Sequence, residues 1–88
     1  MSNSQETEEP EIHLPKKLRQ FYEMLRGGGD VKIVDLYVAL SEKPPLPDSA
    51  RMHMWLGPYV VKINRRIKKH GQAVRPGELR RTYRLIVL

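Results

Sequence analysis

The hydrophobic pattern of the chain changes its period at Gly71. Up to that glycine, apolar residues recur at spacings of three and four, which is the pattern of one face of an α-helix. Beyond it, residues 72–88 are rich in β-branched and aromatic residues and are divided by a Pro-Gly turn signal. We therefore expect a fold that is mainly α-helical and ends in a C-terminal β-hairpin, with strands at about 72–75 and 81–87. The 88 residues suffice for one domain.

Glycine and proline residues divide the helical part into four expected helices, at 15–26, 31–42, 48–56 and 58–70. The first ends at three consecutive glycines, and a proline-rich loop separates the second from the third. Asp30 is placed to cap the second helix. A Gly-Pro pair separates the third from the fourth, because proline is favoured at the first position of a helix and disfavoured inside one.

The first expected helix has one apolar face, formed by Leu18, Phe21, Tyr22 and Leu25. Two uses of this face are open at this stage. It can pack against the core of a domain at 13–88, as an extra N-terminal helix. It can instead form a homodimer interface, since proteins that read DNA with helices often dimerise.

Several large side chains near the basic part of the chain are expected to be structural. We expect Trp55 and Tyr83 to lie in the core, and Met52 and Met54 to fill space around Trp55. Asn64 borders the apolar stripe of its helix, so a structural hydrogen bond is favoured over the reading of an adenine edge.

Charge is distributed unevenly along the chain. Residues 1–11 hold four Glu and no Lys or Arg, which predicts a disordered acidic tail over residues 1–12. Residues 51–88 hold ten Lys or Arg and one Glu, a net charge of +9 within a protein whose net charge is +6. A segment this basic attracts polyanions, of which nucleic acid is the commonest.

The order of helix, short helix, basic helix and hairpin predicts a winged helix-turn-helix that binds double-stranded DNA. The helix at 58–70 would enter the major groove, which is wide enough for one α-helix. The hairpin at 72–88 would act as the wing, reaching the backbone or the minor groove. Tyr59 can touch DNA or pack against the body of the domain. The expected DNA-binding residues are Tyr59, Lys62, Arg65, Arg66, Lys69, Arg75, Arg80 and Arg81.

The stretch from about residue 31 to residue 88 resembles the winged-helix effector domain of OmpR/PhoB-type response regulators. The segment GPYVVKINRRIKKHG is similar to that family's recognition helix, and Tyr83-Arg84-Leu85 matches the closing strand of its wing. The resemblance implies a transcriptional regulator. The family's small N-terminal sheet and its phosphoacceptor domain have no counterpart in the pattern, so phosphorylation control is not implied.

Other classes of function are not favoured by the residues present. The chain has no cysteine, and its three histidines lack carboxylates at ligand spacing, so we expect no metal site and no cofactor. No paired acids or nucleophile–base set indicates an enzyme. No apolar run is long enough to cross a membrane. We expect a cytoplasmic, nucleoid-associated protein. The alternative function is a protein-interaction module, an antiactivator or adaptor that binds a larger regulator.

Overall fold

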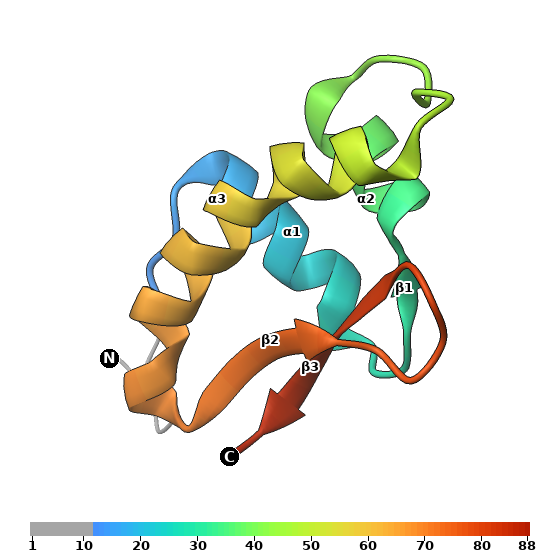
Figure 1. The fold of residues 1–88 in the computed structure, drawn as a ribbon. Coiled ribbons are helices and arrows are strands. Elements are labelled where there is room, and N and C mark those ends of the chain that lie inside the picture. The colour runs from blue at the N-terminus through green and yellow to red at the C-terminus, as the bar shows by residue number, and fades with distance from the viewer. Residues whose placement is uncertain (1–11) are drawn as a thin grey trace.

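The computed structural model describes residues 12–88, so the expected acidic tail lies outside the described residues, except for Ile12. Three α-helices and a three-stranded antiparallel sheet make up this part of the chain (Figure 1). The elements follow one another as α1, β1, α2, α3, a 3-10 turn, β2 and β3. Their bounds are Lys16–Arg26, Val31–Lys32, Ile33–Ser41, Ser49–Ile67, Lys68–His70, Gln72–Pro76 and Thr82–Val87.

The first helix lies at the centre of the core. Phe21 and Leu25 of α1 are fully buried, and the ring of Phe21 lies 6.4 Å from the ring of Tyr83 on β3. The polar side of α1 binds the end of α2, where Lys17 Nζ donates a hydrogen bond to the Leu40 carbonyl at 2.6 Å. The expectation that the apolar face of α1 packs against the core of the domain is therefore confirmed. A homodimer through this helix would have to use its polar side.

Asp30 does not cap a helix, which corrects the expectation for residues 31–42. The first two residues of that range form β1, which pairs with β3 through Val31 opposite Tyr83 and Lys32 opposite Thr82. α2 begins only at Ile33, and no side chain caps its start. The sequence pattern missed β1 because a two-residue strand is stabilised by its distant partner and leaves no period of its own.

Residues 49–67 form one continuous helix, so the expected break at Gly57 is wrong. Its buried side chains Met52, Leu56, Ile63 and Ile67 lie on one face that runs past the Gly-Pro pair without a change of phase. Burial along this whole face offsets the cost of the hydrogen bond to the preceding turn that Pro58, which has no N–H, cannot make. Asp48 caps the helix, accepting a hydrogen bond from the Ala50 amide at 2.9 Å.

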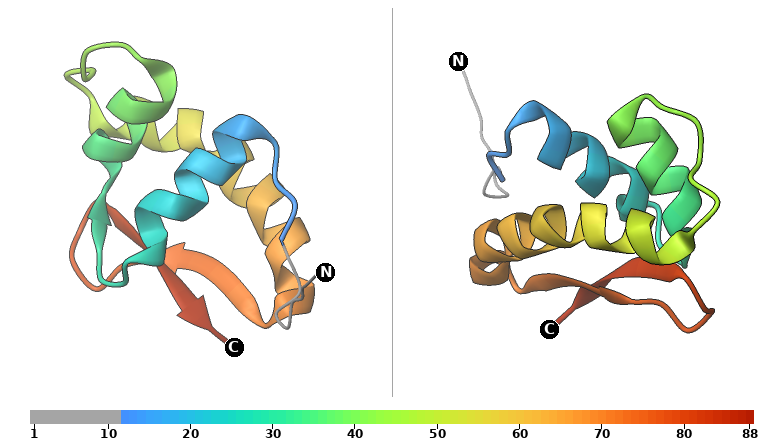
Figure 2. Two further views of the ribbon diagram at one scale, coloured as in Figure 1. Left: turned by 180° about the vertical axis from the view of Figure 1, so that it is seen from behind. Right: turned by 45° about the horizontal axis from the view of Figure 1, so that its top comes forward.

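The C-terminal hairpin packs against α3, with the three helices on one side of it (Figure 2). β2 pairs with β3 from Gln72 opposite Val87 to Pro76 opposite Tyr83, which confirms the expected hairpin. Asn64 fastens β2 to α3. Its amide donates to the Val74 carbonyl at 3.2 Å, and its oxygen accepts from the Val74 amide at 2.7 Å. The expectation of a structural hydrogen bond at Asn64 is thus confirmed.

Helix, strand, helix, helix and hairpin in this order form a winged helix-turn-helix, as expected from the sequence. Most core expectations hold: Met52 and Tyr83 are buried, and Trp55 is half-buried with its edge against Tyr37. Met54 is the exception. It is 74% exposed, because it lies on the side of α3 opposite Met52 and Leu56.

Candidate nucleic-acid interface

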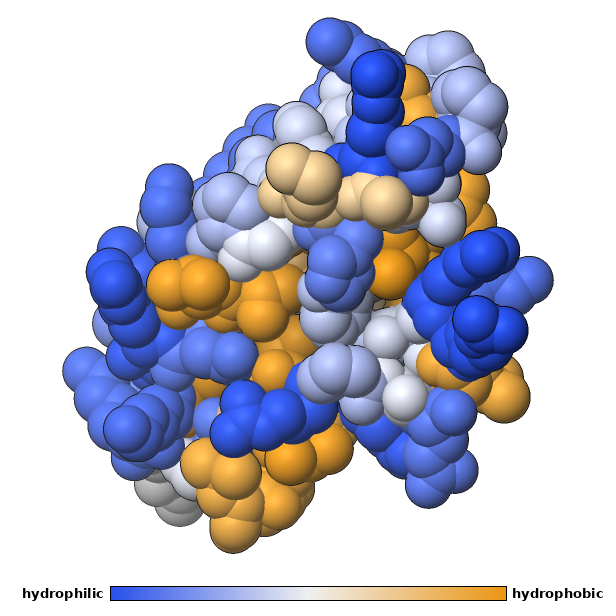
Figure 3. Space-filling view, in the orientation of Figure 1, coloured by the Kyte–Doolittle hydropathy of each residue, from blue (hydrophilic) through white to orange (hydrophobic). Residues whose placement is uncertain are grey.

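The outer edge of α3 is the line of side chains that points away from the core. At 100° per residue this line runs through Ala50, Met54, Pro58, Val61 and Arg65, all of which are exposed. In the orientation of Figure 1, hydrophobic surface lies in the middle of the molecule, and strongly hydrophilic surface lies to its left and right (Figure 3). The edge is therefore free to contact a partner along most of the helix.

The tip of the hairpin, residues 77–81, is held in place by Asp30. One oxygen of the Asp30 carboxylate accepts a hydrogen bond from the Leu79 amide at 2.8 Å, and the other faces Arg84 Nε at 3.6 Å. Gly77 fits against this carboxylate closely, since a Cβ atom at that position would collide with it and with the Thr82 hydroxyl. The tip is thus an ordered turn built on an acid whose side chain is only 11% exposed.

One side-chain hydrogen bond and one backbone hydrogen bond complete the tip, which carries two arginines. The Thr82 hydroxyl donates to the Leu79 carbonyl at 2.6 Å, and the Ile33 amide donates to the Arg81 carbonyl at 2.9 Å. Arg81 adopts a left-handed backbone conformation with φ of 59°, which is uncommon for a residue with a side chain. Arg80 and Arg81 are both exposed. The tip therefore presents two adjacent guanidinium groups to solvent.

The hairpin tip lies beside the beginning of α3. Residues 76–82 line a surface hollow together with Ser49, Ala50 and His53. The imidazole of His53 stacks on the ring of Tyr83, with centroids 5.6 Å apart and planes 11° apart, and lies 3.2 Å from the Tyr83 hydroxyl. Burial raises the pKa of that hydroxyl. The contact joins α3 to the hairpin.

The predicted basic residues fall into two groups along α3. Lys62, Arg65, Arg66 and Lys69 lie on or just beyond the C-terminal half of α3, whereas Arg80 and Arg81 lie near its beginning. The reason is that β2 runs back along α3. Five strand residues at about 3.3 Å each cover the length of roughly eleven helical residues. The return brings the tip level with His53, about 14 Å along the helix from Lys62.

The two groups lie on opposite flanks of the outer edge. Lys62 and Arg66 line a hollow with Pro15 and Lys17 at the start of α1, on the side of α3 away from the sheet. The hairpin occupies the other flank, which faces His53 and Asn64. Positive charge therefore borders α3 on both sides.

Most of these cations have no acidic neighbour within the part of the chain that the structure describes. Residues 12–88 contain four ion pairs. Of the ten basic residues in 51–88, only Arg84 takes part in any of these pairs. Arg84 pairs with Asp30 at 3.6 Å and with Glu78 at 3.5 Å, so its charge is partly neutralised within the hairpin and by the acid that holds the hairpin tip. Arg75 sits opposite Arg84 in the sheet and is exposed.

Tyr59 packs against a neighbouring aromatic residue of α3. Its ring lies 4.9 Å from that of Trp55, and its side chain is only partly exposed. Three further residues near this surface were not among the predicted site residues: Arg51 on α3, His53 beside the hairpin, and Lys32 beside the hairpin tip. Arg51 and His53 belonged to the expected short helix, which was read only for its inward side. Lys32 was hidden inside the expected second helix.

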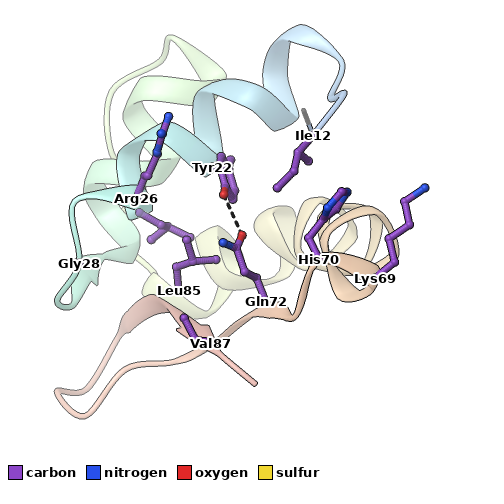
Figure 4. Close-up of a pocket in the computed structure, with 10 residues that line it drawn as sticks. Ile12, Tyr22, Arg26, Gly28, Lys69, His70, Gln72, Leu85 and Val87 are labelled. Carbon is purple, nitrogen blue, oxygen red and sulfur yellow. Dashed lines mark hydrogen bonds between the residues drawn. The ribbon is translucent and has the colours of Figure 1, made fainter. Parts of the chain in front are cut away.

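A third hollow lies at the far end of the hairpin, between α1, the 3-10 turn and β3 (Figure 4). Its walls combine apolar side chains with Arg26, Lys69 and His70, and the Tyr22 hydroxyl donates to Gln72 Oε1 across it at 2.7 Å. Among residues 12–88, no carboxylate side chain lines this hollow. Over residues 12–88, no three His, Asp or Glu side chains are grouped so as to hold a metal ion.

Within the described residues, no helix is both long enough and apolar enough to cross a bilayer. The chain matches no family model, no curated protein and no solved structure in the comparisons made. Any function of this chain must therefore be inferred from its fold and from the surface just described.

Proposed function

We propose that this protein binds double-stranded DNA in a sequence-specific manner and acts as a small transcriptional regulator. In this proposal α3 enters the major groove and the hairpin serves as the wing. The observation that carries it is the pair of cationic flanks, Lys62 with Arg66 and Arg80 with Arg81, on either side of the exposed edge of α3.

The geometry of duplex DNA explains why two flanks suit the proposal. A helix in the major groove has a phosphate backbone on each side of it, so cations are needed on both flanks rather than at one point. The wing then extends past one backbone, where Arg80 and Arg81 can reach the adjacent minor groove. Arg65 lies on the outer edge itself, where a planar guanidinium can bind guanine O6 and N7 together.

The resemblance to OmpR/PhoB-type effector domains supports the same assignment, although the residues that carry it cover only part of the proposed recognition helix. The residues that carry it, Val60 to Ile67 and Tyr83 to Leu85, lie in the second half of α3 and in β3. The remainder of α3 extends the helix toward the wing. The proposed recognition helix therefore covers Ser49–Ile67 rather than 58–70 alone.

Selection of duplexes from a random pool, followed by affinity measurements on the selected site, tests the proposal. We expect Arg65→Ala to weaken the selected site by about 1–3 kcal/mol and random duplex much less, because a base contact is lost. Lys69→Ala should weaken both duplexes alike, because a phosphate contact is lost.

Arg19→Ala is the matched control, since Arg19 is an exposed arginine on α1. It should leave both affinities within about twofold of the unaltered protein, as expected for a surface change outside the interface. Equal losses from Arg65→Ala on every duplex would contradict base reading by Arg65. Selection that enriches no sequence would contradict the proposed function.

A protein-interaction role has one observation in its favour, the exposed apolar side chains Met54 and Val61 on α3. An antiactivator or adaptor would dock this edge on a larger regulator. It would then bind no duplex even at low salt, which separates it from the DNA-binding proposal.

A further inference from the structure

The outer edge of α3 has an unusual composition for a surface that faces nucleic acid. Its first four members, Ala50, Met54, Pro58 and Val61, have no side-chain hydrogen-bond donor or acceptor beyond a thioether. Met54 is 74% exposed and Val61 is 52% exposed. Only at the fifth member, Arg65, does the edge present a strong donor. Hydrogen bonds to base edges therefore cannot come from most of this line.

Charge around this apolar line argues for an anionic occupant. Arg51 and Lys62 are exposed on one flank of the edge, and Arg80 with Arg81 lies beyond the other. A partner that covered the line with a purely apolar surface would bring these cations close to it without neutralising them. A duplex provides both features at once, since its phosphates meet the flanks and the thymine methyl is an apolar group on the groove floor.

We propose that Met54 and Val61 read thymine by contact with its 5-methyl group, which makes A·T pairs the preferred pairs opposite this part of α3. The inference rests on the proposed function and names the chemistry that the site selects. Met54 and Val61 are seven residues apart on one helix edge, roughly 10 Å along its axis. That separation corresponds to about three base-pair steps of a duplex that rises 3.4 Å per step. The two contacted thymines should therefore be about three positions apart.

Replacement of thymine by deoxyuridine tests this directly, because it removes only the methyl group. At each contacted thymine of the selected duplex, we expect the dissociation constant to rise about fourfold, the ratio equivalent to about 0.8 kcal/mol for one buried methyl. The same replacement at a thymine outside the bound part of the duplex should leave the dissociation constant unchanged. Equal binding of the thymine and deoxyuridine duplexes by a protein that still selects a sequence would overturn the inference alone.

Variants assign each methyl contact to a side chain. Val61→Ala should bind the thymine and deoxyuridine duplexes equally at one position, and Met54→Ala should do so at the other. Val38→Ala is the matched control, since Val38 is a partly exposed valine on α2 and should retain the fourfold discrimination. Discrimination that survives in both α3 variants would also overturn the inference. Failure to bind any duplex would instead refute the proposed function, and this inference with it.

Discussion

Replacing Asp30 with alanine should loosen the hairpin tip and destabilise the whole domain. Asp30 is the only residue outside the hairpin whose side chain bonds to the tip backbone, among the described residues. Its side chain is 11% exposed, so water replaces its contacts poorly. The tip carries Arg80 and Arg81, so loosening it should also lower DNA affinity if the proposed function holds.

The size of the effect follows from two contacts. The bond from the Leu79 amide to the carboxylate is a hydrogen bond to a charged group, and such bonds contribute about 1.5–3 kcal/mol. The ion pair with Arg84 adds less than about 1 kcal/mol, because Arg84 is one-third exposed and retains Glu78. We therefore expect Asp30→Ala to lower the free energy of unfolding by about 2–3 kcal/mol. Asp30→Asn keeps an acceptor for Leu79 and should lose about half as much.

Urea unfolding followed by circular dichroism measures this loss. The described 77 residues should have a total stability of about 4–12 kcal/mol, so a loss of 2–3 kcal/mol moves the midpoint clearly. Asp35→Ala, an exposed acid on α2, is the matched control and should cost well under 1 kcal/mol. If Asp30→Ala and Asp35→Ala shift the midpoint equally, the carboxylate does not hold the tip and the reasoning is refuted.

Three further outcomes follow from the described contacts. Gly77→Ala should destabilise the domain by about 2 kcal/mol, because its Cβ collides with side chains already packed there; an unchanged melting temperature would contradict this. Asn64→Ala should cost about 2 kcal/mol in urea unfolding, since it leaves the part-buried Val74 amide without its acceptor, and rapid amide exchange at Val74 should accompany the loss. The raised pKa of Tyr83 means that the folded state holds this proton more tightly than the unfolded chain. Its contribution to stability is therefore complete below the ordinary tyrosine pKa of 10.0 and declines as the pH rises through the folded pKa, and Tyr83→Phe should abolish that part of an alkaline unfolding curve.

Local patterns in the sequence were enough to predict the hairpin and the boundaries of α1. Both elements have a clear period, and glycines or a Pro-Gly pair end them. The continuity of α3 was missed because Pro58 was weighed as a local breaker. The apolar positions before and after it share one phase, and that longer-range signal decides the helix.

The features of this surface that the sequence did not predict have one cause, which is contact between residues distant in the sequence. The pairing of β1 with β3 and the bond between Asp30 and the hairpin tip join positions about 50 residues apart, and neither leaves a local pattern. The seven predicted basic residues are all exposed, whereas Tyr59, the one aromatic residue predicted with them, is only partly exposed. Their division into two flanks depends on the direction in which β2 returns along α3, which follows from tertiary packing.

The salt dependence of duplex binding tests the central claim most directly. Titration of a random-sequence duplex by fluorescence anisotropy, at salt concentrations from about 50 to 200 mM, gives the number of phosphates contacted. With about four to six contacts shared by the two flanks of α3, we expect a log–log slope of about −4 to −5, a loss of affinity of roughly 250- to 1,000-fold over that range. Absence of binding at the lowest salt, or affinity that does not change with salt, would contradict a DNA-binding role for this surface.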